Sequence, residues 1–172
     1  MIELTFFSAI SAILLFGFII TGVVCFGLQP SYSAYSSLWG KAVPMNNMNL
    51  WSVITLVAAF LLCPPLLELG VGSLWQFLGF LTPVYLIVVS LTPEWEINKT
   101  QHIIHMLFAI LCVLGGLGWL VFIMHAYKAL AIAMAFTAAM ALFSGTARTS
   151  AVFWGEMLMF LSVYLTVFFA LL

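Results

Sequence analysis

Aspartate is missing from this chain, and charged side chains of every kind are scarce. Five glutamates and four lysines and arginines give a formal net charge of -1, and charged residues occupy 5% of the 172 positions. A soluble domain carries about 25% charged residues and about 45–50% apolar ones, whereas 66% of this chain is apolar. These proportions exclude a water-soluble globule or a nucleic-acid-binding protein. They predict an integral membrane protein whose surroundings are the lipid bilayer.

Several catalytic motifs are absent as well. Without aspartate there is no Ser-His-Asp triad, and the chain has no Gly-rich phosphate loop, Gly-x-Ser-x-Gly elbow or Cys-x-x-Cys pair. Cys25, Cys63 and Cys112 all lie in apolar stretches, which is typical of small buried or lipid-facing residues rather than of disulfides or metal ligands. The composition therefore favours a protein without a cofactor and without enzymatic activity.

Six apolar stretches, separated by short polar intervals, predict transmembrane helices, because a span needs about 20 residues. We expect a compact all-α bundle with very short loops, forming one domain over residues 1–172. The first stretch is too long for a cleaved signal peptide and lacks its basic flank, so we expect it to be retained. The expected spans are residues 5–27, 50–68, 73–92, 101–123, 127–144 and 151–171.

Residues 29–49 form the longest polar interval. Tyr32, Tyr35 and Trp39 suit a position among the lipid headgroups, so we expect a loop or short element lying on the membrane surface. Asn49 is the predicted N-cap of the following helix. An aromatic belt at the span ends is also expected. Its members are Trp51, Trp75, Trp95, Trp119 and Trp154.

Two features of the spans concern helix shape and helix packing. Pro64 and Pro65 lack an N–H group and crowd the preceding turn, so the helix should kink or end near Cys63; Pro83 should kink the next one. Small residues let helices approach closely in lipid, which predicts a tight seam between the spans 101–123 and 127–144, or a homo-oligomer or membrane partner there. The residues concerned are Gly115, Gly116, Gly118, Ala131, Ala135, Ala138 and Ala139.

The distribution of basic residues predicts an orientation. Lys41, Lys99 and Arg148 fall on one side of a six-span chain, whereas Lys128 lies on the other side with both termini. Basic loops prefer the cytoplasm, so the termini are expected on the non-cytoplasmic side. The expected location is the bacterial inner (cytoplasmic) membrane.

Ionisable residues at membrane depth are candidate functional residues. Glu156 lies about 9 Å along the last span, and His105 lies at a similar depth from the same side, so the two should meet. His102 precedes His105 by three residues and shares its helical face. Structural roles are the alternatives. Glu156 could be a buried carboxyl that only donates or accepts hydrogen bonds, the two histidines could lie at the membrane interface, and Glu68 could mark an interfacial helix end. The candidates for ligand binding or proton relay are Glu156, His105, His102, Glu68 and Arg148.

A metal site is a further alternative. Zinc could bind His102, His105 and Glu156 with a water molecule, which is the two-histidine, one-carboxylate set of some catalytic sites. His125 could not join them, because a continuous helix places it about 34 Å from His102.

Four segments carry a resemblance to a known family. They are Ser31-Tyr32-Ser33-Ala34-Tyr35, Pro64-Pro65-Leu66-Leu67-Glu68, His102-x-x-His105 and Phe153-Trp154-Gly155-Glu156-Met157. With the six-span layout, the chain resembles the small Frag1/DRAM-type membrane proteins and multi-span bacterial proteins of this size. The resemblance implies a helical membrane fold and brings no catalytic residues.

Together these features favour a protein that binds or translocates a small ligand or lipid through a polar site in one leaflet. The alternatives are an intramembrane metal-dependent lipid hydrolase and a structural or accessory membrane subunit.

Overall fold

The computed structural model describes residues 2–43, 49–93, 98–146 and 148–172, and every regular element in these ranges is helical. The expected belt residue Trp95 lies outside the described residues. The elements in chain order are α1 (Ile2–Phe26), the 3-10 turn η1 (Tyr32–Ala34), α2 (Tyr35–Ala42), α3 (Leu50–Leu69), α4 (Phe77–Ser90), α5 (Lys99–Phe122), α6 (Tyr127–Phe143) and α7 (Ala151–Leu171).

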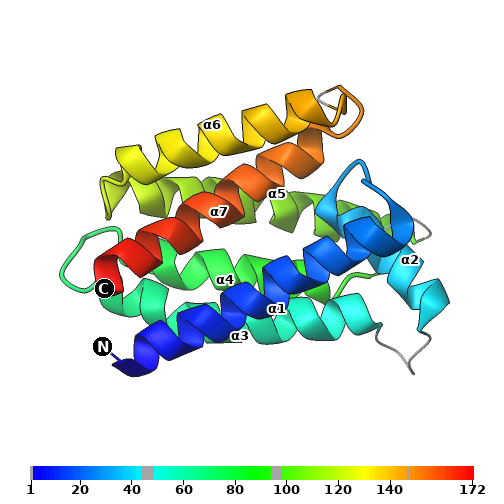
Figure 1. Ribbon diagram of the computed structural model, residues 1–172. Helices are drawn as coiled ribbons and strands as arrows, with labels where there is room; N and C mark the ends of the chain where they lie inside the picture. Colours follow the sequence, from blue (N-terminus) through cyan, green and yellow to red (C-terminus); the bar gives the residue numbers. More distant parts are fainter. Residues whose placement is uncertain (1, 44–48, 94–97, 147) are drawn as a thin grey trace.

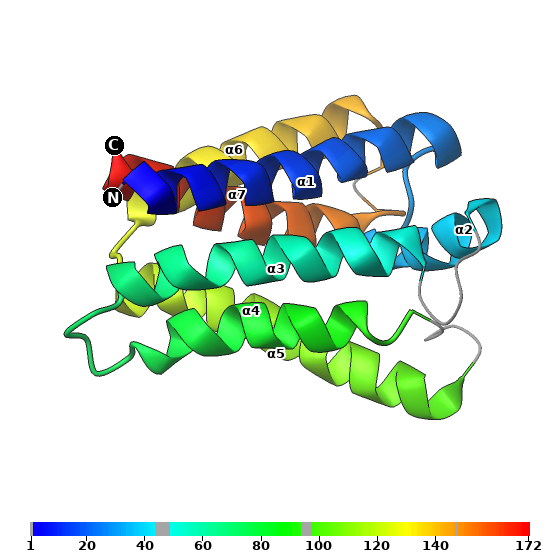
Figure 2. The ribbon, with the colours of Figure 1, turned by 90° about the horizontal axis from the view of Figure 1, so that it is seen from below.

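The long helices run alongside one another in a bundle (Figures 1 and 2). Helices α1, α3, α4 and α5 pack on one another in that order, α7 crosses α1, α3 and α5, and α6 packs on α7. Both termini lie at one end of the bundle, and the short helix α2 lies at the opposite end, which we refer to as the α2 end (Figure 1).

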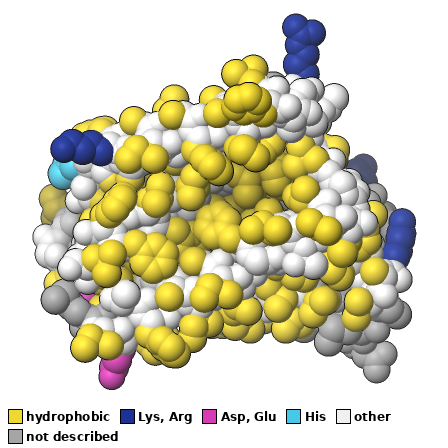
Figure 3. Space-filling model, viewed as in Figure 1, with side chains coloured by type: hydrophobic (Ala, Val, Ile, Leu, Met, Phe, Trp, Pro, Cys, Tyr) yellow, Lys and Arg dark blue, Asp and Glu magenta, His cyan; other side chains and the backbone are white. Residues whose placement is uncertain are grey.

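Four helices are long and apolar enough to cross a membrane: α1, α3, α5 and α7. Helices α4 and α6 are apolar but have 14 and 17 residues, fewer than the about 20 that a bilayer requires. The expected span 73–92 was too long, because residues 73–76 precede the helix, which begins at Phe77. In the face seen in Figure 3, charged side chains project from the two ends and hydrophobic side chains cover the middle.

The paired prolines do not end their helix. Helix α3 continues through Pro64 and Pro65 to Leu69, so an end near Cys63 is wrong. Pro83 likewise lies inside α4. Membrane helices tolerate proline where neighbouring groups stabilise the backbone. The indole N–H of Trp119 in α5 donates to the Leu66 carbonyl oxygen over 3.2 Å and so provides a partner for one of the last carbonyl groups of α3.

The glycines of α5 face α4 and α7 rather than α6. A Cβ added at Gly115 would lie 2.9 Å from the Thr82 hydroxyl in α4, and one at Gly116 would lie 3.0 Å from the Met159 sulfur in α7. Helices α5 and α6 touch only slightly. The prediction of a tight seam between these two helices is therefore wrong.

Helix α6 packs on α7 through a different small-residue stripe. Ala129, Ala133, Thr137 and Ala141 are buried and recur every four residues, which places them on one helical face. Because α7 is the main neighbour of α6, this stripe is the one that packs. The residues expected at a seam, Ala131, Ala135 and Ala138, are exposed.

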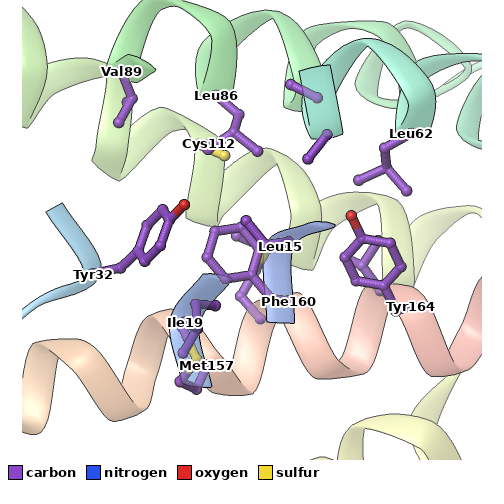
Figure 4. Packing of buried hydrophobic residues seen from close by; sticks show 14 of the residues in the cluster. Leu15, Ile19, Tyr32, Leu62, Leu86, Val89, Cys112, Met157, Phe160 and Tyr164 are labelled. Atoms are coloured by element: carbon purple, nitrogen blue, oxygen red, sulfur yellow. The ribbon is translucent and has the colours of Figure 1, made fainter. Parts of the chain in front are cut away.

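Several aromatic residues expected among the lipid headgroups are buried in the protein instead. Trp51 and Trp119 have no exposed surface, and Tyr32, Tyr35 and Trp39 are also buried. Figure 4 shows Tyr32 reaching into the same apolar core as residues of α1, α4, α5 and α7. The polar atoms of Tyr32, Tyr35 and Trp119 have hydrogen-bond partners inside the protein, whereas the indole N–H groups of Trp39 and Trp51 have none among the described residues. The positions of these rings along the sequence therefore did not decide between the membrane interface and the core.

The close approach of α3 and α4 leads to a first prediction. A Cβ at Gly79 would lie 2.6 Å from the Leu66 carbonyl oxygen, which is closer than real Cβ contacts allow. Gly79→Ala should therefore push the two helices apart and destabilise the protein by about 1–3 kcal/mol. Thermal unfolding in detergent micelles measures the effect. The matched control is Gly17→Ala in α1, where the added Cβ meets nothing within 4 Å; equal stability of the two variants would contradict the prediction.

Candidate functional site

A groove of about 600 Å³ opens between α5 and α7. Its walls are residues of α5 between His102 and Leu117, residues of α7 between Val152 and Leu158, and the turn at residues 30–33. This volume lies within the range of about 300–1,000 Å³ typical of small-molecule sites. The groove is therefore large enough to hold a ligand.

The lining of the groove changes from polar to apolar along α5. His102 and His105 lie near the start of the helix, at the α2 end, and Ala109, Val113 and Leu117 follow on the same wall. From His105 to Leu117 the helix rises about 18 Å, which slightly exceeds half of the about 30 Å hydrocarbon core. The groove thus has one polar end and an apolar length comparable to one leaflet.

Glu156 stands at the polar end and binds the backbone of η1. Its Oε2 accepts a hydrogen bond from the Tyr32 N–H over 2.6 Å. One turn earlier in α7, the Phe153 N–H donates to the Pro30 carbonyl oxygen over 2.9 Å. Two hydrogen bonds of opposite direction therefore attach residues 30–32 to the first turns of α7.

Glu156 also borders a second, small cavity on the core side. This cavity has a volume of about 20 Å³, and Tyr32, Cys112 and Phe160 are among the residues that line it. Such a volume is sufficient for about one water molecule. The carboxyl group therefore lies in the wall between the open groove and the packed core.

Tyr32 connects this wall to α3. Its side chain is 2% exposed and packs against the rings of Trp51 and Phe160. Its hydroxyl lies 2.6 Å from the Thr55 hydroxyl in α3. Burial raises the pKa of the Tyr32 phenol above its usual value near 10 because the ionised form loses its hydration. The hydroxyl is therefore neutral and stays hydrogen-bonded at physiological pH.

The residues after Tyr32 attach the turn further. The Tyr35 hydroxyl donates to the Gly27 carbonyl oxygen over 3.0 Å, and burial raises the pKa of this phenol too. The Asn49 side chain caps α3 by accepting from the Ser52 N–H over 2.9 Å, as predicted, and donates to the Ser36 carbonyl oxygen. The segment from η1 to α2 is therefore packed against the other helices, whereas a position on the membrane surface was expected.

His105 joins α5 to the end of α4. The ring is 1% exposed, and its Nδ1 lies 2.9 Å from the Thr92 hydroxyl and 3.2 Å from the Thr92 carbonyl oxygen. A carbonyl oxygen can only accept, so the geometry fits Nδ1 as the donor. His102, one turn earlier, is exposed at the rim of the groove. His105 therefore positions the α5 wall.

The structure brings three of the five candidates together. Glu156, His105 and His102 all line the groove. Glu156 bonds to Tyr32 and His105 to Thr92, and the functional role of each residue stays a prediction. Glu68 is exposed near the end of α3, and Arg148 is exposed in the connection before α7; neither is part of the groove lining.

Sequence reasoning missed the partners of these side chains. Tyr32 was expected at the surface and is instead the donor to Glu156, while Thr92 was overlooked as the partner of His105. The one local signal was Ser31, whose side chain accepts from the Ala34 N–H as an N-cap of η1. A cap predicts a helical turn but not its insertion among other helices.

The proposed zinc set is not assembled. Among the described ranges, no three side chains of His, Cys, Asp or Glu form a group that could hold a metal ion. The set of His102, His105 and Glu156 is therefore corrected: these residues share a groove without forming a metal-binding cluster.

Comparisons with known proteins provide no relative from which a role could be transferred. No protein-family model, curated protein or solved structure matches this chain. The Frag1/DRAM-type resemblance therefore stays an interpretation of the four segments quoted for it. Function has to follow from the groove and its residues.

The contact between Glu156 and η1 leads to a second prediction. Glu156→Ala leaves the Tyr32 N–H without its acceptor, a loss of about 1–3 kcal/mol locally. Hydrogen exchange of the Tyr32 amide should therefore accelerate by about tenfold or more. Glu156→Gln keeps an acceptor oxygen and should exchange nearly as slowly as the natural chain.

Amide exchange followed by mass spectrometry of peptides covering residues 28–36 measures this difference. Glu68→Ala serves as the control, because Glu68 is exposed and outside the groove. Unchanged exchange in Glu156→Ala would show that the carboxylate does not hold the turn.

Proposed function

We propose that this protein binds a membrane amphiphile, such as a lipid, in the groove between α5 and α7. The headgroup lies at Glu156 and the tail follows α5 towards Leu117. The observation that carries this proposal is the groove of about 600 Å³ that is polar at one end and apolar over the rest. An amphiphile has the same division between a polar and an apolar part.

The direction of the groove supports an acyl chain as the tail. The apolar wall follows α5, one of the helices able to cross a membrane, over about 18 Å. A chain lying along α5 would therefore keep roughly the orientation and depth that it has in one leaflet. A compact polar ligand would leave most of this wall without a matching surface.

The close packing of the core behind the groove favours binding over translocation. Beyond Glu156 the core side offers a cavity of about 20 Å³, with room for about one water molecule. The surrounding core is closely packed, with Leu15, Val163 and Val167 almost without exposed surface. A lipid that enters the groove would thus be held rather than passed through the bundle.

We also propose that α4 and α6 cross the membrane with the four longer helices, giving six spans. Helix α4 lies alongside α3 and α5, and α6 lies alongside α7, as Figures 1 and 2 show. Helices of 14 and 17 residues rise about 21 and 25 Å. Flanking turns or local thinning of the bilayer can accommodate the difference at modest cost.

The groove leads to a third prediction, which uses two glycines. Gly155 of α7 lines the groove, and a Cβ added there meets nothing within 4 Å. Gly155→Phe should fill the groove without straining the fold and lower amphiphile occupancy by about tenfold, or about 1.4 kcal/mol of binding free energy. Native mass spectrometry of the purified protein measures the bound amphiphile.

Gly17→Phe is the matched control for this substitution. Gly17 is also helical, exposed and open to an added Cβ, but it lies in α1 and outside the groove. Its occupancy should equal that of the natural chain. Equal occupancy in the two variants would exclude the groove as the binding site.

The orientation leads to a fourth prediction. Lys41, Lys99 and Arg148 flank helix ends at the α2 end, so this end should face the cytoplasm in a bacterial inner membrane. Alkaline phosphatase fused after Leu172 should be active, and after Phe143 inactive, because the enzyme needs an oxidising compartment for its disulfides. Equal activity of both fusions would contradict six spans.

A further inference from the structure

We propose that the amphiphile bound in this groove carries a cationic ammonium headgroup, which the Glu156 carboxylate binds. This inference rests on the proposed function and specifies its ligand class. Three features support it: the charge of the groove lining, the hydrogen bonding of the Glu156 carboxyl group and its apolar surroundings.

Within the described ranges, the groove lining has one carboxylic acid, Glu156, and neither lysine nor arginine; its only nitrogen bases are His102 and His105. Lys41, Lys99, Lys128 and Arg148 are exposed elsewhere. No ion pair to Glu156 is present among the residues that the structure describes. His105 directs its Nδ1 to Thr92 rather than to Glu156, so a cationic ligand can compensate the charge of an ionised Glu156 carboxylate.

The carboxyl group has acceptor capacity beyond the bond it already makes. Its Oε2 accepts from the Tyr32 N–H, whereas a carboxylate offers about four lone-pair sites on its two oxygens. The hydrogen bond holds the group in one orientation at the groove wall. An ammonium group supplies three donors and no acceptor, so it matches this arrangement.

The apolar surroundings make the choice of headgroup matter. Most of the wall next to Glu156 is aliphatic, with Ala109, Ile110 and Val113 on the α5 side. Charge pairs interact more strongly in such a medium than in water, and charge-assisted hydrogen bonds are about twice as strong as neutral ones. A phosphate or carboxylate headgroup would instead place a second negative charge beside Glu156, which disfavours it.

Tail contacts cannot provide this selectivity. Lipid tails are as apolar as the groove, so a tail gains little by leaving bulk lipid for the protein. The preference for one amphiphile over another must therefore come mainly from the polar end. Among the described residues at the polar end, Glu156 carries the negative charge that distinguishes a cationic headgroup from an anionic one.

The test compares three probes with the same tail: dodecylamine, 1-dodecanol and dodecanoate. The full-length protein is held in dodecyl maltoside micelles, whose sugar headgroup is uncharged, and native mass spectrometry measures each bound probe. We expect dodecylamine to bind about tenfold more tightly than 1-dodecanol, and dodecanoate to bind most weakly. This ranking is measured on the natural chain and does not depend on any variant.

Glu156→Gln then removes the charge while keeping an acceptor for the Tyr32 N–H. It should abolish the preference for dodecylamine over 1-dodecanol. Glu68→Gln removes the same charge from an exposed position outside the groove and should leave the ranking intact. A preference that survives Glu156→Gln, or is lost equally in both variants, would overturn the assignment to Glu156.

The outcomes separate this inference from the proposed function. If the three probes bind equally and Gly155→Phe weakens all of them, amphiphile binding in the groove stands and the ammonium assignment is overturned. If dodecanoate binds most tightly, the assignment is likewise overturned. If no probe binds the natural chain, both the proposed function and this inference fail.

Discussion

The hydrogen bond from the Tyr32 N–H to the Glu156 carboxylate is the interaction on which the α2 end of the bundle depends. Backbone groups that leave a regular helix in an apolar environment need partners, because water is not there to provide them. Residues 30–32 find these partners in α7, through Glu156 and through the Phe153 N–H. The Tyr32 hydroxyl then bonds to Thr55, so one short turn connects α7 with α3.

The same interaction determines the character of the groove. Because the turn is attached to α7, it closes one end of the space between α5 and α7 with polar groups. The length of the groove stays open because α6, although it follows α5 in the chain, packs on α7 through its stripe of alanines and a threonine. Had α6 packed on α5 instead, it would compete for the α5 surface that now lines the groove. Two separate packing choices thus create one amphipathic cavity.

Glu156 has two roles in this arrangement, and they follow from its two oxygens. One oxygen attaches the turn at residues 30–32 to α7 by accepting a hydrogen bond from the Tyr32 N–H. The carboxyl group also forms part of the groove wall, where a ligand can approach it. Glu156 is partly buried, with neither lysine nor arginine in the described groove lining, and an ionised acid at such a place in a membrane is costly unless something compensates it. A bound ammonium group would provide that compensation, which links the stability of the α2 end to occupancy of the groove.

The sequence by itself determined the all-helical membrane class, the positions of the long helices to within a few residues and the Asn49 cap. Each of these depends on local chemistry: apolar runs, a capping side chain and the rise of a helix. Only the tertiary structure decided which helices pack on one another. More than one helix carries a stripe of small residues, and the fit between neighbouring helix surfaces determines which stripe becomes a contact. It also decided that α3 continues through Pro64 and Pro65 and that Tyr32 enters the core. The position of Tyr32 depends on Glu156, which lies far away in the chain and becomes its neighbour only when the chain folds.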